Sequence, residues 1–85
     1  MNKIDPKRYK LSSRTNILQG NKKDFYLVID RKSRIVMKDG YRILKIAKSV
    51  LEVEKSSSID LLTSAPICSK TRVFLSENNI QTKVL

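Results

Sequence analysis

A continuous apolar run at residues 25–29, Phe-Tyr-Leu-Val-Ile, constrains the fold of this 85-residue chain more than any other feature. The run is aromatic and β-branched, and it lies between Asp24 and the polar residues 30–34. This pattern predicts a buried strand. A folded body is therefore expected to begin at about residue 24.

The segments after this strand alternate between helical and extended patterns. Residues 38–55 place apolar side chains at spacings of three and four, which predicts an amphipathic helix. Residues 59–63 predict a second strand, and a second helix is expected from Pro66 to about residue 78 because proline is tolerated in a first helical turn. Residues 80–85 predict a last, short strand.

The order strand, helix, strand, helix, strand predicts an α/β fold. We expect one small domain, residues 24–85, with a mainly parallel three-stranded sheet and right-handed crossovers. Residues 1–23 are predicted to form a basic N-terminal arm. Apolar residues in the arm, around Tyr9 and around Ile17, allow an edge strand or hairpin that extends the sheet.

The positive charge is concentrated in the arm. Seven of the 18 Lys and Arg residues lie in the first 23 positions beside a single acid, Asp5, and the formal net charge of the whole chain is +10. Clustered cations displace counterions from phosphate-rich polymers, so nucleic acid is the expected partner. The alternative interpretation is a basic surface that is simply solvated.

The residue inventory excludes several function classes. One cysteine and no histidine rule out an intrachain disulfide, a zinc site and a histidine-based nucleophilic triad. Only Gly20 and Gly40 are present, so neither a Walker loop nor a dinucleotide fingerprint can be formed. We expect a protein that is not an enzyme and uses no cofactor or metal. No apolar run could span a bilayer or act as a signal peptide, so a cytoplasmic location without membrane contact is expected.

The predicted phosphate contacts come from three parts of the chain. Arginines and lysines after the first strand lie where the carboxyl ends of parallel strands meet, and serines open the second helix on the same edge, so an anion site is expected there. The alternative is a solvated turn capped by serine. The candidate residues are Arg8, Lys10, Arg14, Lys22 and Lys23 in the arm, Arg31, Lys32 and Arg34 after the first strand, and Ser64, Ser69 and Lys70 at the second helix.

The predicted first helix carries a basic face opposite its apolar face. A helical wheel places Tyr41 among the cations of that face, which are Arg42, Lys45, Lys48 and Lys55. An aromatic ring among cations can stack on a base while its neighbours hold phosphates. In the alternative interpretation Tyr41 folds over the sheet edge, and Lys48 only pairs with Glu52.

Cys68 lies just inside the predicted second helix. The helix dipole and Lys70 favour a reactive thiolate there, although a free cysteine is commonly an inert core residue. Residues 61–80, LLTSAPICSKTRVFLSENNI, resemble the active-site strand and helix of glutaredoxins, in which Cys-Pro-x-Cys is followed by basic residues and a Phe-Leu pair. In that alignment Cys68 takes the place of the second cysteine and Ala65 that of the first. The resemblance implies a thioredoxin-like unit without dithiol activity.

Three functions remain open, of which thiol chemistry at Cys68 is the third, and the missing second cysteine counts against it. The first is a non-enzymatic module that binds RNA or DNA through phosphates with little sequence preference. The second is a protein-interaction subunit or homodimer, in which an uncovered sheet edge and the apolar side chains of the arm dock on a partner. Those side chains are Tyr9, Leu11, Ile17 and Leu18.

Overall fold

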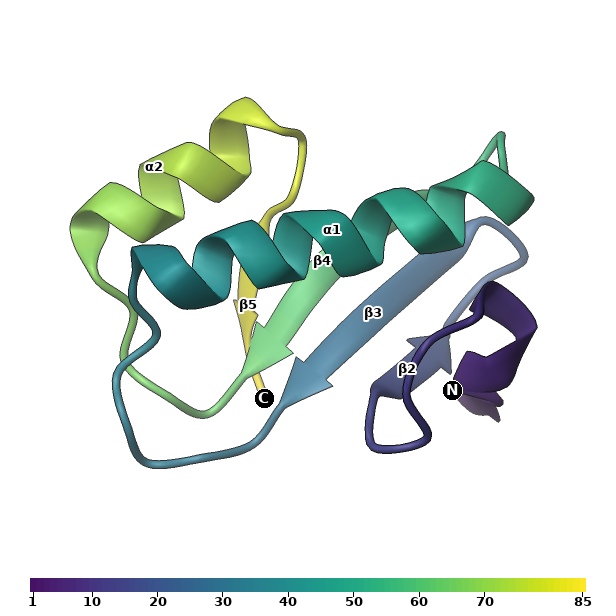
Figure 1. Ribbon diagram of the computed structural model, residues 1–85, viewed down its shortest axis with the longest axis horizontal. Helices are drawn as coiled ribbons and strands as arrows, with labels where there is room; N and C mark the ends of the chain where they lie inside the picture. Colours follow the sequence, from purple (N-terminus) through teal and green to yellow (C-terminus); the bar gives the residue numbers. More distant parts are fainter.

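The apolar run at residues 25–29 lies in the middle strand of a five-stranded sheet in the computed structural model, which describes residues 1–85 (Figure 1). The elements in chain order are β1 (Asn2–Ile4), the 3-10 helix η1 (Pro6–Tyr9), β2 (Asn16–Gln19), β3 (Asp24–Ile29), α1 (Met37–Val53), β4 (Ser58–Thr63), α2 (Ser69–Glu77) and β5 (Thr82–Val84).

The sheet is mixed, with the strands in the order β1-β2-β3-β4-β5. The pairs β1–β2 and β2–β3 are antiparallel, whereas β3–β4 and β4–β5 are parallel. The prediction of a mainly parallel three-stranded sheet is therefore wrong. The cause is a tight turn, in which the Gly20 N–H donates to the Asp24 carbonyl at 2.8 Å and the Asn21 side chain donates to the Asp24 carboxylate at 3.2 Å. This turn folds β2 back on β3, so β3 has a partner on each side.

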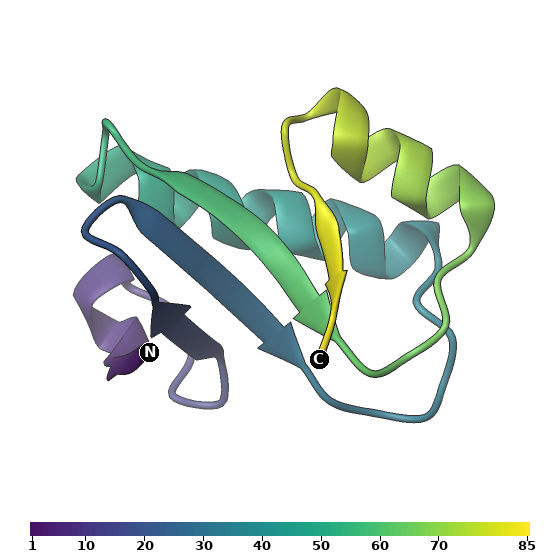
Figure 2. The same cartoon turned by 180° about the vertical axis from the view of Figure 1, so that it is seen from behind.

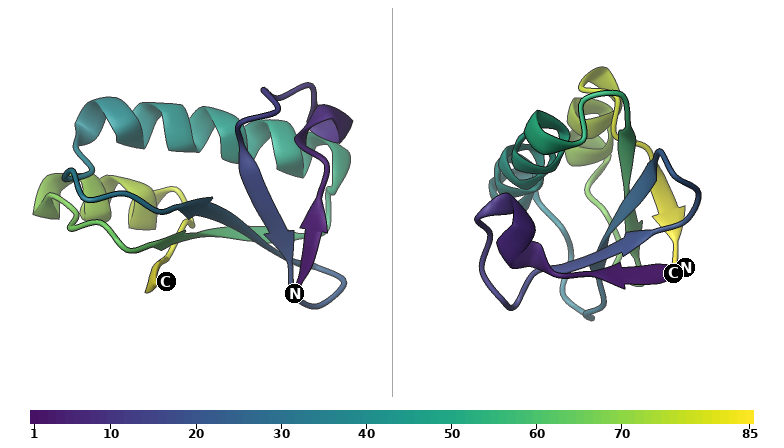
Figure 3. Two further views of the ribbon diagram at one scale, coloured as in Figure 1. Left: turned by 90° about the horizontal axis from the view of Figure 1, so that it is seen from below. Right: turned by 90° about the vertical axis from the view of Figure 1, so that its right-hand side faces the viewer.

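Both helices cover the same face of the sheet (Figures 2 and 3). Alternate residues of β3 and β4 point at the helices, because successive strand residues face opposite sides. The buried apolar side chains of these two strands are Phe25, Leu27, Ile59 and Leu61, and α1 and α2 add Ile43, Ala47, Val50 and Leu75. Burying one large aliphatic or aromatic side chain contributes about 1.5–3 kcal/mol. Neither helix is long and apolar enough to cross a membrane.

The two helices approach each other closely at Gly40. A Cβ atom at this position would lie 3.0 Å from Cγ2 of Thr71 and 3.4 Å from Cδ2 of Phe74. A larger residue would therefore push α2 away from α1. Glycine at this position lowers the helix propensity of the first turns of α1, and the close packing of α2 against α1 compensates for this loss.

The 3-10 helix η1 fastens the N-terminal segment to the core. Asp5 caps it by accepting the Lys7 N–H at 3.0 Å, and Lys10 ends it in the left-handed conformation with φ 61°. The Tyr9 ring is 3 % exposed and meets the Phe25 ring edge-on at 6.4 Å. Ile17 is also fully buried, so neither Tyr9 nor Ile17 is free to dock on a partner as the sequence suggested.

The face of the sheet away from the helices is bare (Figure 2). Strand register places Leu18 beside Tyr26 and Val28 beside Leu62 on this face, and all four side chains are half-buried. At the β5 edge the Lys83 ammonium lies 3.4 Å from the Asp60 carboxylate and 5.5 Å from the centre of the Tyr26 ring. Lys83 thus covers part of the apolar surface that Leu18, Tyr26, Val28 and Leu62 form on this face.

Candidate functional site

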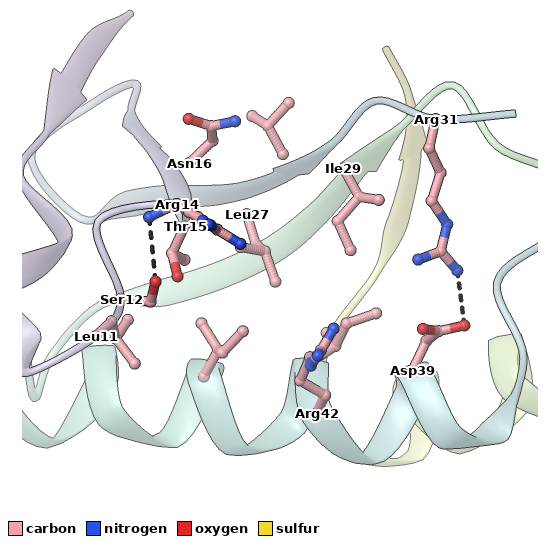
Figure 4. A pocket seen from close by; sticks show the side chains of 13 residues that line it. Leu11, Ser12, Arg14, Thr15, Asn16, Leu27, Ile29, Arg31, Asp39 and Arg42 are labelled. Carbon is pink, nitrogen blue, oxygen red and sulfur yellow. Dashed lines mark hydrogen bonds and ion pairs between the residues drawn. The ribbon is translucent and has the colours of Figure 1, made fainter. Parts of the chain in front are cut away.

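The largest hollow in the structure is a cleft between α1 and the carboxyl end of β3, closed on its outer side by the segment 11–16 (Figure 4). We call it the arginine cleft. It has a volume of about 600 Å³. Three of its lining residues are arginines from separate parts of the chain, Arg14, Arg31 and Arg42, and the single acidic residue is Asp39.

The cleft exists because β2 is shorter than β3. Pairing of β2 with β3 stops at Asn16 opposite Val28, so Ile29 has a strand neighbour only on β4. The chain before β2 turns away from the sheet here, through a turn in which Ser12 accepts the Thr15 N–H on its carbonyl and the Arg14 N–H on its hydroxyl. The space between sheet and helix therefore stays open, and its apolar floor consists of Leu27, Ile29, Ile43 and Ile46, with Leu11 at the side.

Arg31 is held in place by hydrogen bonds from two of its three guanidinium nitrogens. Nε donates to the Ser33 carbonyl at 3.1 Å, and Nη2 donates to the Arg34 carbonyl at 3.2 Å and to Asp39 Oδ2 at 2.7 Å. The remaining nitrogen, Nη1, makes no hydrogen bond and points into the cleft (Figure 4). Arg31 is thus an oriented donor with unused N–H groups.

Asp39 joins Arg31 to the start of α1. The carboxylate accepts hydrogen bonds from Arg31 and from the Val36 N–H at 3.0 Å, which satisfies a free amide at the helix start. The Arg31 hydrogen bond is the largest cause that holds the pKa of Asp39 below its ordinary value; the Val36 bond and the nearby charge of Arg42 act in the same direction. Asp39 is therefore ionised at neutral pH and compensates one of the three arginines.

Arg14 and Arg42 form no ion pair, and both side chains are exposed. They extend from opposite walls into the space between α1 and β3 (Figure 4). With one carboxylate against three guanidinium groups, the cleft carries a net charge of +2. A site with this charge and an apolar floor can bind an anionic group that carries an apolar body.

The structure brings only two of the predicted phosphate contacts, Arg14 and Arg31, into this cleft. Sequence reasoning placed Arg42 on the basic face of the helix and missed it as a site residue. The signal that could have found it is the Asp39–Arg42 spacing of three, which puts both residues on one side of a helix next to the end of a strand.

The other predicted contacts lie apart from one another. Arg8 pairs with Glu54 at 3.3 Å near the end of α1, Lys10 follows η1, and Lys22 and Lys23 occupy the β2–β3 turn at the opposite end of β3. Lys32 and Arg34 lie exposed in the loop before α1. The hydroxyl of Ser64 donates to the Asp30 carboxylate at 2.5 Å, so it is already engaged.

Tyr41, Ser69 and Lys70 share a second, shallower groove between α1 and α2. The Tyr41 ring packs edge-on against Phe74 at 5.2 Å but remains 59 % exposed. Met37 and Val73 complete the apolar part of this groove. The ring of Tyr41 is therefore part of an apolar groove and does not line the arginine cleft.

Cys68 is half-buried and immediately precedes α2. The backbone N–H groups of Lys70 and Thr71 hold the pKa of this thiol below its ordinary value, and the charge of Arg34 contributes in the same direction. The structure contains no second cysteine, and no group of three or more Cys, Asp or Glu side chains is placed to hold a metal ion.

No protein-family model, no curated protein and no solved structure matches this chain. The resemblance of residues 61–80 to the glutaredoxin strand and helix therefore stays a prediction.

Proposed function

We propose that this protein is a small non-enzymatic nucleic-acid-binding protein that contacts RNA or DNA mainly through phosphates. The observation that carries the proposal is the convergence of Arg14, Arg31 and Arg42 on one cleft with a single carboxylate. Guanidinium groups suit phosphate because they are always charged, and the planar forks of Arg14 and Arg42 can each donate two parallel hydrogen bonds.

The charge outside the cleft favours a polymer over a small anion. The chain has 18 Lys and Arg residues, but the structure contains only three ion pairs, so most cations are free to meet phosphates. Three exposed cations, Lys38, Arg42 and Lys45, follow one another at spacings of four and three and form a stripe along α1. A strand with one phosphate in the cleft can continue along this stripe.

Binding of the full chain to labelled single-stranded RNA, single-stranded DNA and duplex DNA, each at a low and a high salt concentration, tests this function. Phosphate contacts release counterions, so the binding constant should fall by about 0.7 log units per contact for each tenfold rise in salt on a single strand. An unrelated protein of similar charge is the control. Binding no tighter than that of the control, or binding that salt does not weaken, would contradict the proposal.

A second candidate function is a protein-interaction subunit, and the groove between α1 and α2 favours it. Tyr41 and Val73 are 59 % and 56 % exposed there, although both are large and apolar. Sedimentation over a range of concentrations tests self-association through this groove. A dimer that Val73→Glu converts to monomer supports this function, whereas a monomer at all concentrations argues against a homodimer.

A further inference from the structure

The arrangement of Arg31 indicates a site prepared for an anion. Its Nε and Nη2 are fixed by two backbone carbonyls and by Asp39, so the direction of Nη1 is set before any ligand arrives. A fixed donor loses less conformational entropy on binding than a free arginine does. The two N–H groups of Nη1 are the only side-chain donors of Arg31 without a partner in the structure.

Arg14 and Arg42 complete the part of the site that would bind an anionic group. They come from the segment before β2 and from α1, so the fold itself brings them to Arg31. Their charges repel each other without a ligand, because the one carboxylate in the cleft is already bound to Arg31. A phosphate between the three guanidinium groups removes this repulsion.

The floor of the cleft sets a second requirement. Ile29 and Ile46 in the floor and Leu11 at its side are only half-buried, so they expose aliphatic carbon, and an inorganic ion would leave this surface in contact with water. A base carried by the same nucleotide as the phosphate would cover it. The volume of about 600 Å³ falls within the usual size of small-ligand pockets, about 300–1,000 Å³.

A paired base cannot reach such a floor, because in a duplex the bases are stacked inside and the phosphates are outside. An unpaired nucleotide can present its phosphate and its apolar part to the same cleft. We infer that the arginine cleft binds one unpaired nucleotide of a single strand, with its phosphate on Arg14, Arg31 and Arg42 and its base on the apolar floor. This inference rests on the proposed nucleic-acid-binding function and specifies its substrate as single-stranded.

The test compares two variants of equal charge change. Arg14→Gln/Arg42→Gln removes the two unpaired arginines of the cleft, and Lys7→Gln/Arg72→Gln removes two exposed cations of η1 and α2 that do not line it. None of these four side chains makes an ion pair, so all variants should fold, which circular dichroism checks. The probes are a labelled single-stranded DNA, the duplex of the same sequence, a nucleoside 5′-monophosphate and inorganic phosphate.

We expect the cleft variant to bind the single strand about tenfold or more weakly than the wild type, because charge-assisted hydrogen bonds to phosphate are among the stronger hydrogen bonds. The control variant should lose much less affinity. The monophosphate should bind the wild type more tightly than inorganic phosphate does, and the cleft variant should lose this binding. The duplex should bind the wild type more weakly than the single strand.

Three outcomes would overturn the inference and leave the proposed function standing. They are equal losses in the two variants, equal affinity for single strand and duplex, and equal affinity for the monophosphate and inorganic phosphate. Absent or salt-insensitive binding of every polynucleotide by the wild type would instead overturn the proposed function, and the inference with it.

Discussion

The Tyr9 hydroxyl donates a 2.8 Å hydrogen bond to Oε2 of Glu54, the residue that follows the last turn of α1. The same oxygen lies 3.3 Å from the Arg8 guanidinium. One carboxylate therefore fastens the 3-10 helix near the N-terminus to the far end of the long helix. This contact holds the chain before β2 against the core, and the next part of that chain forms the outer wall of the arginine cleft.

Replacing Tyr9 by phenylalanine should lower the free energy of unfolding by about 1–2 kcal/mol. The ring and its contact with Phe25 remain, but the Glu54 carboxylate loses a hydrogen bond in a partly buried place. Urea denaturation measures the change. Tyr41→Phe is the matched control, because the exposed Tyr41 hydroxyl makes no hydrogen bond within the protein, and it should leave stability unchanged.

The same tyrosine should make the protein less stable at alkaline pH. Burial of the ring, followed by the hydrogen bond to Glu54, raises the pKa of Tyr9 from 10.0 to about 12. The folded state thus keeps a proton that the unfolded chain releases, so this contribution to stability is complete below pH 10 and is lost as pH rises towards about 12. Urea midpoints measured across this range should fall more steeply for the wild type than for Tyr9→Phe. Parallel curves would contradict the prediction.

Asp39→Asn should destabilise the protein and remove an acid-sensitive contribution. The asparagine loses the ion pair with Arg31 and weakens the contact with the Val36 N–H, which together should cost about 1–2 kcal/mol at neutral pH. The pKa of Asp39 is lower in the folded state than in the unfolded chain, so its contribution is present above the ordinary aspartate pKa and is lost as pH falls through the folded-state value.

Thermal unfolding of this variant at neutral and acidic pH measures both effects. The difference from the wild type should shrink as the pH is lowered. Glu52→Gln is the control, because Glu52 is exposed and makes no ion pair. A difference that stays constant down to acidic pH would show that Asp39 does not titrate as described.

The elements after residue 24 could be located from sequence because their signals are local. A continuous apolar run and a spacing of three and four each need only neighbouring residues, so residues 25–29 and 38–55 were informative by themselves. The strands β1 and β2 have three and four residues, with polar and basic neighbours. Their pairing depends on the turn at Gly20–Asp24 and on the edge of β3, and neither is visible as a period. The prediction of a three-stranded sheet was therefore wrong.

The candidate site, too, depends on contacts between distant parts of the chain that the sequence does not show. Arg14 and Arg31 were identified by their charge, since cations attract phosphate wherever they lie. Arg14 and Arg42 converge because the pairing of β2 with β3 stops at Asn16 opposite Val28, and no pattern in the sequence indicates where this pairing stops. Tyr9 was placed in the basic arm, in an edge strand or as a docking side chain, but Glu54, which accepts its hydrogen bond, is 45 residues away.

Gly40→Val should destabilise the protein by about 1–3 kcal/mol. The new side chain meets Thr71 and Phe74 where a single Cβ would already lie 3.0 Å from a carbon of Thr71, so α2 has to move outwards. Chemical denaturation measures the loss. Lys38→Val, on the exposed side of the same turn, controls for the low helix propensity of valine and should cost no more than about 1 kcal/mol. Equal costs at the two positions would show that the helices do not pack as closely as described.

Cys68 should react with thiol reagents at a lower pH than a cysteine in an unstructured peptide. The N–H groups of Lys70 and Thr71 and the charge of Arg34 favour the thiolate, and this lowers the pKa of the thiol. The rate of alkylation measured against pH gives the titration midpoint. Arg34→Gln should move the midpoint upwards, whereas Lys7→Gln, which removes a charge from η1, should not. The structure holds no second cysteine that could form a disulfide within the chain, so thiol chemistry would depend on an activated Cys68 alone. A midpoint equal to that of the peptide would therefore argue against thiol chemistry in this protein.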